Sequence, residues 1–220
     1  MDYSFDFNSI SFAPLWQGLL VTLQLTAAAN VMGLIAGFIL ALLVMSRYRI
    51  VRAPCMLFIE FFRCTPVIVQ IVWFFYCVPM LFDVFLAPMT MGILALGLNL
   101  VAFNAEAYRA AIQAVPRQQL DAGVALGLGP LQRILHIVLP TALRSATPVL
   151  LTNGITIFQQ SSLVAVVAIQ DLTYQGRLLA TETYRPIETF TVVALVYFFI
   201  SLPITRLVDA IERRREQALA

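Results

Sequence analysis

The sequence predicts an all-α integral membrane protein that forms one transmembrane domain over residues 1–220, and three observations support this. First, 60% of the 220 residues are hydrophobic and 12% are charged, whereas a soluble domain carries about 25% charged residues. Second, the chain contains five long uncharged stretches, each near or above the roughly 17 residues that a membrane-crossing helix needs. Third, the basic residues lie unevenly between these stretches. The net charge of +2 is too small to indicate nucleic-acid binding.

The uncharged stretches predict five transmembrane helices. In chain order we expect the crossings at residues 15–45, 55–82, 89–112, 143–168 and 189–211. Residues 7–14 are polar and end in a proline, so we expect them to lie at the membrane interface. The second crossing would contain Glu60 and Arg63. Charged side chains are costly inside a bilayer and usually have a function there.

The distribution of arginine predicts the orientation in the membrane. All 14 basic residues are arginine, and most of them would lie on one side, in the links after the first and third crossings and at the C-terminus. These are Arg47, Arg49, Arg52, Arg109, Arg117, Arg133, Arg144, Arg206, Arg213, Arg214 and Arg215. Basic residues concentrate in cytosolic loops. We therefore expect the N-terminus outside, with Asp2 and Asp6, and the C-terminus inside.

The link over residues 114–140 is the most informative segment of the chain. It is too long for a tight connection between two crossings and too short for a domain. Pro116 can begin a helix, and Gly127 and Gly129 can end it. We therefore expect a short cytosolic helix between crossings three and four. Its pattern fits two interpretations equally well: a docking element for a soluble partner, or a helix that lies on the lipid headgroups.

This link also carries a spaced set of small residues. Asp121, Ala122 and Gly123 are followed after three residues by Gly127, and after nine more by the run that ends in Pro140. The spacing resembles the EAA loop of binding-protein-dependent ABC importers, which reads Glu-Ala-Ala, three residues, Gly, nine residues and Ile-x-Leu-Pro. Asp121 and Gly123 depart from that pattern, but the aspartate keeps the charge and the glycine keeps the small surface. The resemblance implies that this helix, which begins near Arg117, couples the chain to an ATPase.

Three further segments resemble polar amino-acid permeases of the histidine/glutamine type. The run from Glu60 to Pro66 resembles their Glu-x-x-Arg-Gly-Thr-Pro segment, with a cysteine in place of the glycine. Glu106 and Arg109 resemble the Ala-Glu-x-x-Arg that precedes their EAA loop. Residues 159–163, Gln-Gln-Ser-Ser-Leu, resemble a Lys-Asp-Thr-Ser-Leu segment. Residues 150–159 look closest to the glutamate/aspartate branch of the family.

The resemblance implies an assembly in the bacterial inner membrane. Family members pair two permease subunits, which bind two cytosolic ATPase subunits and receive a polar amino acid from a periplasmic binding protein. This chain has no Gly-x4-Gly-Lys-[Ser/Thr] phosphate loop and no lysine from which to build one. We therefore expect ATP and Mg on the partner ATPases, no cofactor on this chain and no enzymatic activity of its own. Whether the second permease subunit is identical or different stays open.

Two groups of polar residues inside the membrane have alternative interpretations. Glu60 and Arg63, three residues apart, could form an ion pair that stabilises the bundle, or the arginine could attract the carboxylate of a passing amino acid. Pro66 supports the second interpretation because it frees a backbone carbonyl one turn earlier, and broken helices often line transport sites. Glu106 and Arg109 should form a structural ion pair. The run 159–162 could contact substrate or hydrogen-bond between helices.

These interpretations define the expected substrate pathway and the rival functions. The pathway comprises Arg63, Thr65, Gln159, Gln160, Ser161 and Ser162. The single histidine, His136, has no ligand partners in the sequence, so we expect no metal site. A permease for another small polar solute and a scaffold that only assembles a complex are the alternatives. A secondary transporter would need more crossings or inverted repeats, which the sequence lacks.

Overall fold

The computed structural model describes the backbone of residues 12–219 and the side chains of residues 12–213. The expected places of Asp2, Asp6 and residues 7–11 therefore lie outside the described residues, as do the side chains of Arg214 and Arg215. Every regular element within the described residues is a helix. In chain order the elements are α1 (Phe12–Val44), α2 (Arg49–Cys64), α3 (Val67–Val72), η2 (Trp73–Cys77), α4 (Val78–Phe82), α5 (Pro88–Gln113), α6 (Arg117–Ala125), α7 (Pro130–Arg133), η3 (Ile134–Val138), α8 (Leu139–Gln160), η4 (Ser161–Val167), α9 (Leu172–Thr183) and α10 (Pro186–Leu219).

Four segments of the described chain are long and apolar enough to cross a membrane. They are Phe12–Val44, Pro88–Gln113, Pro130–Val167 and Pro186–Arg213. The pair α2 and α3–α4 passes the same test together, but its halves are bent by 109°. The chain therefore has the predicted five crossings when this bent pair is counted as the second.

The second crossing differs from the single helix expected at residues 55–82. It begins earlier, at Arg49, and it breaks between Cys64 and Val67. Pro66 explains the break, because proline lacks the amide hydrogen that a helix needs and forces the residue before it out of the helical conformation. Accordingly, Thr65 has an extended backbone, with φ −105° and ψ 141°.

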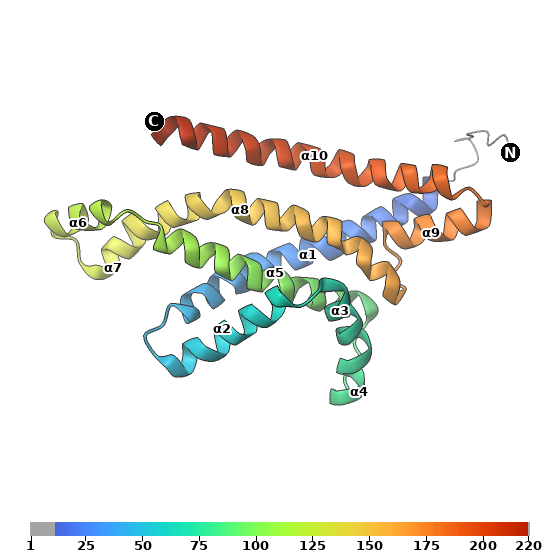
Figure 1. Cartoon of the computed structure of the whole chain (residues 1–220), viewed down its shortest axis with the longest axis horizontal. Coiled ribbons are helices and arrows are strands. Elements are labelled where there is room, and N and C mark those ends of the chain that lie inside the picture. The colour runs from blue at the N-terminus through green and yellow to red at the C-terminus, as the bar shows by residue number, and fades with distance from the viewer. Residues whose placement is uncertain (1–11, 220) are drawn as a thin grey trace.

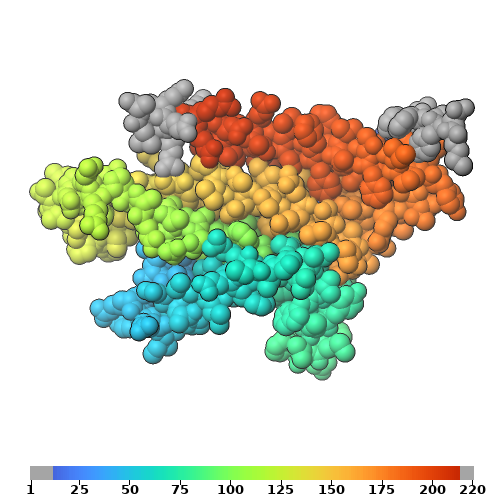
Figure 2. Space-filling model, in the orientation of Figure 1, coloured from blue at the N-terminus to red at the C-terminus, as the bar shows by residue number. Residues whose placement is uncertain are grey.

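The long helices lie side by side along the long axis of the molecule (Figure 1). At one end Figure 1 shows α6, α7, the turn between α1 and α2, and the C-terminal end of α10. The start of α10 and the whole of α9 lie at the other end. This arrangement gathers the arginine-rich links at one end of the bundle, as the predicted orientation requires. Figure 2 shows α6 and α7 projecting beyond the rest of the bundle at that end.

Close packing between α1 and α5 forms the centre of the bundle. Gly33 and Gly37 of α1 face α5: a Cβ atom on Gly33 would overlap Leu100, and one on Gly37 would lie 2.9 Å from Cβ of Asn104. Small residues allow such close approach of helices in membranes. One side of α5 is thus fixed against α1, which leaves its polar side free to face α2, α3 and α8.

Candidate functional site

The break between α2 and α3 is held by side-chain amides. Because Pro66 cannot donate a hydrogen bond, the carbonyl of Phe62, four residues earlier, loses its helical partner. Gln70 Nε2 donates to this oxygen at 2.9 Å and Asn99 Nδ2 at 3.1 Å. Asn99 Nδ2 also lies 3.1 Å from Gln70 Oε1. The sequence prediction of a freed carbonyl one turn before the proline is confirmed.

The amides at this break come from different helices and are buried. Gln70 lies on α3 and is 4% exposed, while Asn99 lies on α5 and is 2% exposed. Thr65, an expected pathway residue, also takes part: its hydroxyl accepts from Gln70 Nε2 at 2.7 Å and donates to the Phe61 carbonyl at 2.8 Å. Inside a membrane every backbone polar group needs a partner within the protein. The bend therefore depends on a contact between α5 and the α2–α3 break.

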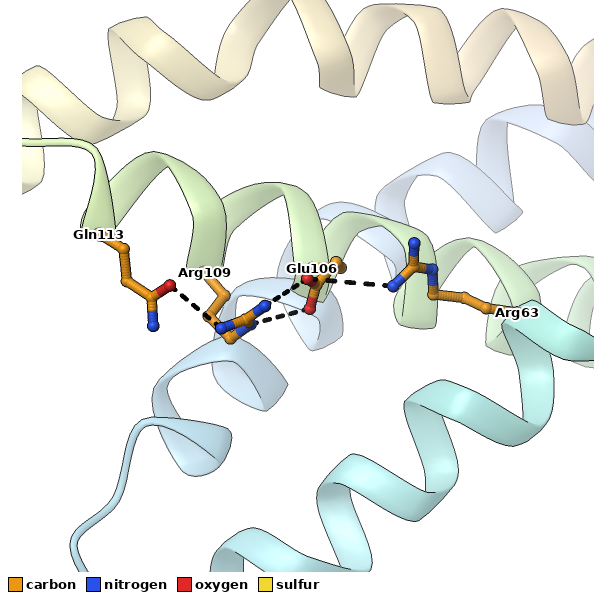
Figure 3. Close-up of polar contacts among 4 residues, drawn as sticks. All are labelled: Arg63, Glu106, Arg109 and Gln113. Carbon is orange, nitrogen blue, oxygen red and sulfur yellow. Dashed lines mark hydrogen bonds and ion pairs between the residues drawn. The ribbon is translucent and has the colours of Figure 1, made fainter.

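A polar stripe follows Asn99 along α5 toward α6. Glu106 accepts a hydrogen bond from Arg109 Nε at 2.9 Å, and Arg109 Nη1 donates to Gln113 Oε1 at 3.1 Å (Figure 3). The expected ion pair between Glu106 and Arg109 is confirmed. Residues 99, 103, 106 and 113 recur at helical spacing and so lie on one side of the helix.

Arg63 pairs with a residue that the sequence prediction did not select. Its Nη1 atom lies 4.0 Å from Glu106 Oε1 (Figure 3), and its guanidinium carbon lies 5.7 Å from the centre of the Phe103 ring. Glu60 forms no ion pair within the described part of the chain, so the expected Glu60–Arg63 pair is wrong. The last turn of α2 packs against α5, and this brings the arginine to the polar stripe there.

A charged cavity of about 410 Å³ opens beside these residues. Its polar lining is Arg52, Glu60, Arg63, Glu106, Arg109 and Gln113, and its apolar lining is Val44, Met45, Met56 and Ile59. The lining has three arginines and two carboxylates, so it carries an excess positive charge. Val44 and Gln113 end α1 and α5 at the arginine-rich end, which places this cavity on the cytosolic side. Such a cavity can accept a carboxylate.

A smaller cavity of about 170 Å³ lies between α5 and α8, with Phe103 in its wall. It is lined by Asn99, Leu100 and Phe103 of α5 and by Asn153, Thr156, Ile157 and Gln160 of α8, and we call it the amide cavity. Gln160 Oε1 is buried and has no hydrogen-bond partner among the described residues. A buried acceptor without a partner is costly, so this oxygen is suited to receive a donor from a bound molecule.

Only Gln160 of the run 159–162 lines this cavity. Gln159 is exposed, and Ser162 donates its hydroxyl to the Gln159 carbonyl at 2.8 Å. Ser161 is fully buried and bonds the Phe158 carbonyl at 2.7 Å. Consecutive residues of a helix point in different directions, so the four side chains diverge. The chain also changes here from the α8 helix to the 3-10 helix η4. Sequence reasoning missed Phe103, Asn153 and Thr156, although the i, i+3, i+7 spacing of 153, 156 and 160 could have revealed one polar face.

The expected coupling helix is α6, over Arg117–Ala125. Gly127 ends it with φ +72°, while its amide bonds the Val124 carbonyl at 2.9 Å and the Leu128 amide bonds the Gly123 carbonyl at 3.0 Å. This is a Schellman motif, which favours glycine at the left-handed position. The predicted stop at Gly127 is confirmed.

The close approach within this segment occurs at Gly123. A Cβ atom there would lie 2.6 Å from Cδ1 of Ile137 and 3.2 Å from Cγ of Arg133, whereas a Cβ on Gly127 would meet nothing within 4 Å. Asp121 and Ala122 are exposed. Val124 and Leu126 are exposed by 56% and 79%, so α6 presents apolar side chains away from the bundle.

Pro140 connects this segment to the fourth crossing. It is the second residue of α8, and the π-helical turn η3 ends two residues before it, at Val138. In that turn the Leu139 amide bonds the Ile134 carbonyl, five residues earlier. A wider turn just before the proline gives room to a ring that would otherwise clash with the preceding turn. The same arrangement precedes Pro79, where the Val78 amide bonds the Trp73 carbonyl.

Comparison with known proteins identifies the family. Residues 33–217 match the family described as binding-protein-dependent transport system inner membrane component. The chain is 34% identical over 221 residues to the glutamate/aspartate import permease protein GltK of Escherichia coli O6:H1, covering 96% of this chain and 99% of that protein. It is 31% identical over 196 residues to the glutamine transport system permease protein GlnP of Escherichia coli (strain K12), covering 87% and 90%.

Solved structures agree with the sequence comparison. A chain of an amino acid ABC transporter, crystallised with histidines, superposes with a TM-score of 0.89 at 32% identity, over 96% of this chain and 100% of that chain. The MetNI methionine ABC transporter shares the fold, with a TM-score of 0.73 at 18% identity, over 94% of this chain and 99% of that chain. The chain therefore belongs to the inner-membrane components of binding-protein-dependent transport systems, as one of their amino-acid ABC permeases.

Proposed function

We propose that this chain and a second permease subunit form the pathway by which a polar amino acid, glutamate or aspartate above others, crosses a bacterial inner membrane. The observation that carries the proposal is the polar stripe of α5, which lines both the amide cavity and the charged cavity. Polar residues inside a membrane are costly and usually functional. A scaffold that only assembles a complex would need neither cavity, so the stripe favours transport.

Energy would reach the pathway through α6. The apolar side chains of Val124 and Leu126 project from this short helix, next to the exposed Asp121 and Ala122. We infer that a cytosolic ATPase subunit covers this surface, with one ATPase for each permease subunit and with ATP and Mg held by the ATPases. Since Gly123 fits closely against Ile137 at the approach to α8, a push on α6 would move α8.

Charge supports the acidic substrates. The charged cavity has one more arginine than carboxylates, and Arg109 already bonds Glu106 through two nitrogens. Arg63 interacts more weakly with Glu106, because its Nη1 atom lies 4.0 Å from Oε1 of that carboxylate, and the arginine side chain is 42% exposed. Arg63 is therefore the cation best placed to receive a substrate carboxylate. Because the chain is similar to permeases named for glutamate/aspartate and for glutamine, acidic and amide amino acids are the first two substrate classes that an experiment should compare.

A periplasmic binding protein would deliver the amino acid at the opposite end of the bundle. That end is formed by α9 and the start of α10 (Figure 1). Transport coupled to ATP hydrolysis then requires that the binding protein and the ATPases prefer different states of the two permease subunits.

The decisive experiment is an ATPase assay on the complete complex in lipid, with its binding protein and each of the twenty amino acids in turn. We expect glutamate or aspartate to stimulate hydrolysis most strongly. Stimulation by a basic or amide amino acid alone would support amino-acid import but overturn the acidic preference. No stimulation by any amino acid, in a complex shown to be intact, would contradict amino-acid import and favour another solute or a scaffold.

A variant tests the pathway separately. Arg63→Ala should lower uptake of the amino acid while the complex still assembles and binds its ATPases, because the cation that receives the carboxylate is gone. Normal uptake by this variant would remove Arg63 from the pathway and leave it a structural role.

A further inference from the structure

A contact between Phe103 and Arg63 links the wall of the amide cavity to the wall of the charged cavity. The phenyl ring lines the amide cavity, and the guanidinium of Arg63, which lines the charged cavity, lies over that ring at 5.7 Å. Both cavities share α5 as a wall, with Asn99 on one side of Phe103 and Glu106 on the other. A solute that moved from one cavity to the other along α5 would have to pass this ring.

The guanidinium of Arg63, which lies over the Phe103 ring, is held only weakly in that position. Glu106 forms its close contacts with Arg109, at 2.9 Å to Nε and through a second bond to Nη2. Arg63 lies farther from the same carboxylate, at 4.0 Å, and its side chain is 42% exposed. Attraction of a guanidinium to an aromatic face is modest at such exposed sites. Arg63 can therefore move away from Phe103 without leaving Glu106 unpaired.

The two residues also lie on helices that can move relative to each other. Arg63 is in the last turn of α2, two residues before the break at Thr65 and Pro66, where the chain bends by 109°. Phe103 is in the middle of α5, which packs closely against α1 through Gly33 and Gly37. Motion of α2 about the break would carry Arg63 away, while Phe103 stays with the α1–α5 pair.

We propose that Phe103 is the barrier between the amide cavity and the charged cavity, and that Arg63 holds its ring closed. This inference rests on the proposed function, since it assigns a gate to the pathway proposed above. In this state the ring separates the two cavities. When Arg63 withdraws, the ring is free to rotate and the cavities join.

Cysteine accessibility tests the barrier without any need for transport. The three native cysteines, Cys55, Cys64 and Cys77, would be replaced by alanine in the complete complex. Ile157→Cys would place one thiol in the wall of the amide cavity, at a position that is 2% exposed. A membrane-impermeant methanethiosulfonate would then be added from the cytosolic side of inverted vesicles without ATP. We expect slow labelling when Phe103 is present and roughly tenfold faster labelling in Phe103→Ala. A tenfold change in the equilibrium between the closed and open states corresponds to about 1.4 kcal/mol.

Matched variants separate the ring from its cation. Arg63→Gln should speed labelling about fivefold, which corresponds to about 1 kcal/mol, the strength of an exposed cation–π contact. Arg52→Gln removes the same charge from the same cavity, but Arg52 lies at the start of α2, about 16 Å from Arg63 along the helix. This variant should leave the labelling rate unchanged. Phe198→Ala, an exposed phenylalanine of α10, controls for loss of a ring elsewhere.

Two outcomes would overturn the proposal. Equal labelling rates with and without the Phe103 ring, in complexes that still co-purify with their ATPases, would show that Phe103 is no barrier. Equal effects of Arg52→Gln and Arg63→Gln would show that cavity charge, and no contact with the ring, sets the rate. A thiol at Gln113→Cys, on the cytosolic side of the barrier, should react quickly in every variant and confirm that the reagent reaches the charged cavity. Because no substrate is present, a wrong substrate assignment leaves this result unaffected.

Discussion

The chain interrupts helices in two ways, and the contrast explains how each part of the molecule works. After α6, Gly127 turns the chain and the freed carbonyls of Gly123 and Val124 are bonded by the next two backbone amides. After α2, Pro66 turns the chain and the freed carbonyl of Phe62 is bonded by side chains of α3 and α5. At the first break, all of these hydrogen bonds are made within the same segment of the chain. The second depends on another helix, so it can transmit movement between helices.

The largest expected effect concerns the second break. Asn99→Leu keeps the approximate volume of the side chain but removes a donor from the Phe62 carbonyl and from Gln70 Oε1. The Phe62 carbonyl keeps its bond from Gln70 Nε2, so Gln70 Oε1 is the buried group that loses its partner. A buried polar group left without a partner costs about 1–3 kcal/mol, and we expect the stability to fall by up to about 3 kcal/mol. Thermal unfolding in detergent would measure it. Gln113→Leu, an exposed amide on the same helix, should lower the melting temperature little, and equal losses in both variants would remove the special role of Asn99.

The next effect concerns the packing of α6. Gly123→Val would place a branched side chain against Ile137 and Arg133, and overpacking of this kind costs about 1–3 kcal/mol. Because α6 would tilt away from α8, we expect weaker stimulation of the ATPase by substrate while the complex stays in the membrane. Gly129→Ala is the control, since its Cβ would meet only Oε1 of Gln132 at 3.6 Å. Full stimulation in Gly123→Val would argue against coupling through this contact.

A smaller effect is expected at Gly127. An alanine in its left-handed conformation costs about 1–2 kcal/mol, whereas asparagine adopts that conformation more readily. Gly127→Ala should therefore reduce coupled ATPase activity more than Gly127→Asn does, although asparagine is larger. The reverse order, with the larger residue more harmful, would mean that a partner subunit packs directly on Gly127. The activities of the two purified complexes, side by side, decide between these explanations.

The smallest effect is a pH dependence at the outer end of the bundle. Asp171 is 1% exposed and begins α9 by accepting hydrogen bonds from the amides of Tyr174 and Thr173, at 2.8 and 3.2 Å. Burial raises the pKa of this carboxyl above its ordinary value of 3.8, and the backbone hydrogen bonds offset only part of the rise. The folded state thus binds the proton more tightly than the unfolded state, so stability falls as pH rises from 3.8 through the raised pKa.

Asp171→Asn tests this dependence. Asparagine keeps an oxygen that can accept from Tyr174 but does not titrate, so its melting temperature should vary less with pH above 4 than that of the native protein. Melting curves in detergent between pH 4 and 7 would show the difference. Parallel curves for the two proteins would assign the pH dependence to other groups.

The sequence predicts local features well and contacts between helices poorly. The five crossings, the arginine-rich end and the stop at Gly127 depend on composition or on neighbouring residues, and all were predicted. The predicted partner of Arg63 was wrong. Helix spacing favours Glu60, whereas the bend at Pro66 directs α2 against α5 and places Arg63 beside Glu106. Four consecutive helical side chains point in different directions, and the relative position of α5 and α8 determines that Gln160 is the one of 159–162 that lines the amide cavity. The polar lining of the amide cavity from Asn153 and Thr156 required the relative position of α5 and α8.

The break at Pro66 also has a genetic consequence. Straightening the second crossing with Pro66→Ala would let the amide of residue 66 bond the Phe62 carbonyl, and the side-chain amides of Gln70 and Asn99 would then lose the acceptor that they share. The proline and the two amides are therefore coupled, because the amides bond the carbonyl that the proline leaves without a helical partner. A defect caused by loss of the proline should therefore be suppressed by apolar substitutions at 70 and 99, two positions on other helices. A selection for restored uptake would find the suppressors there.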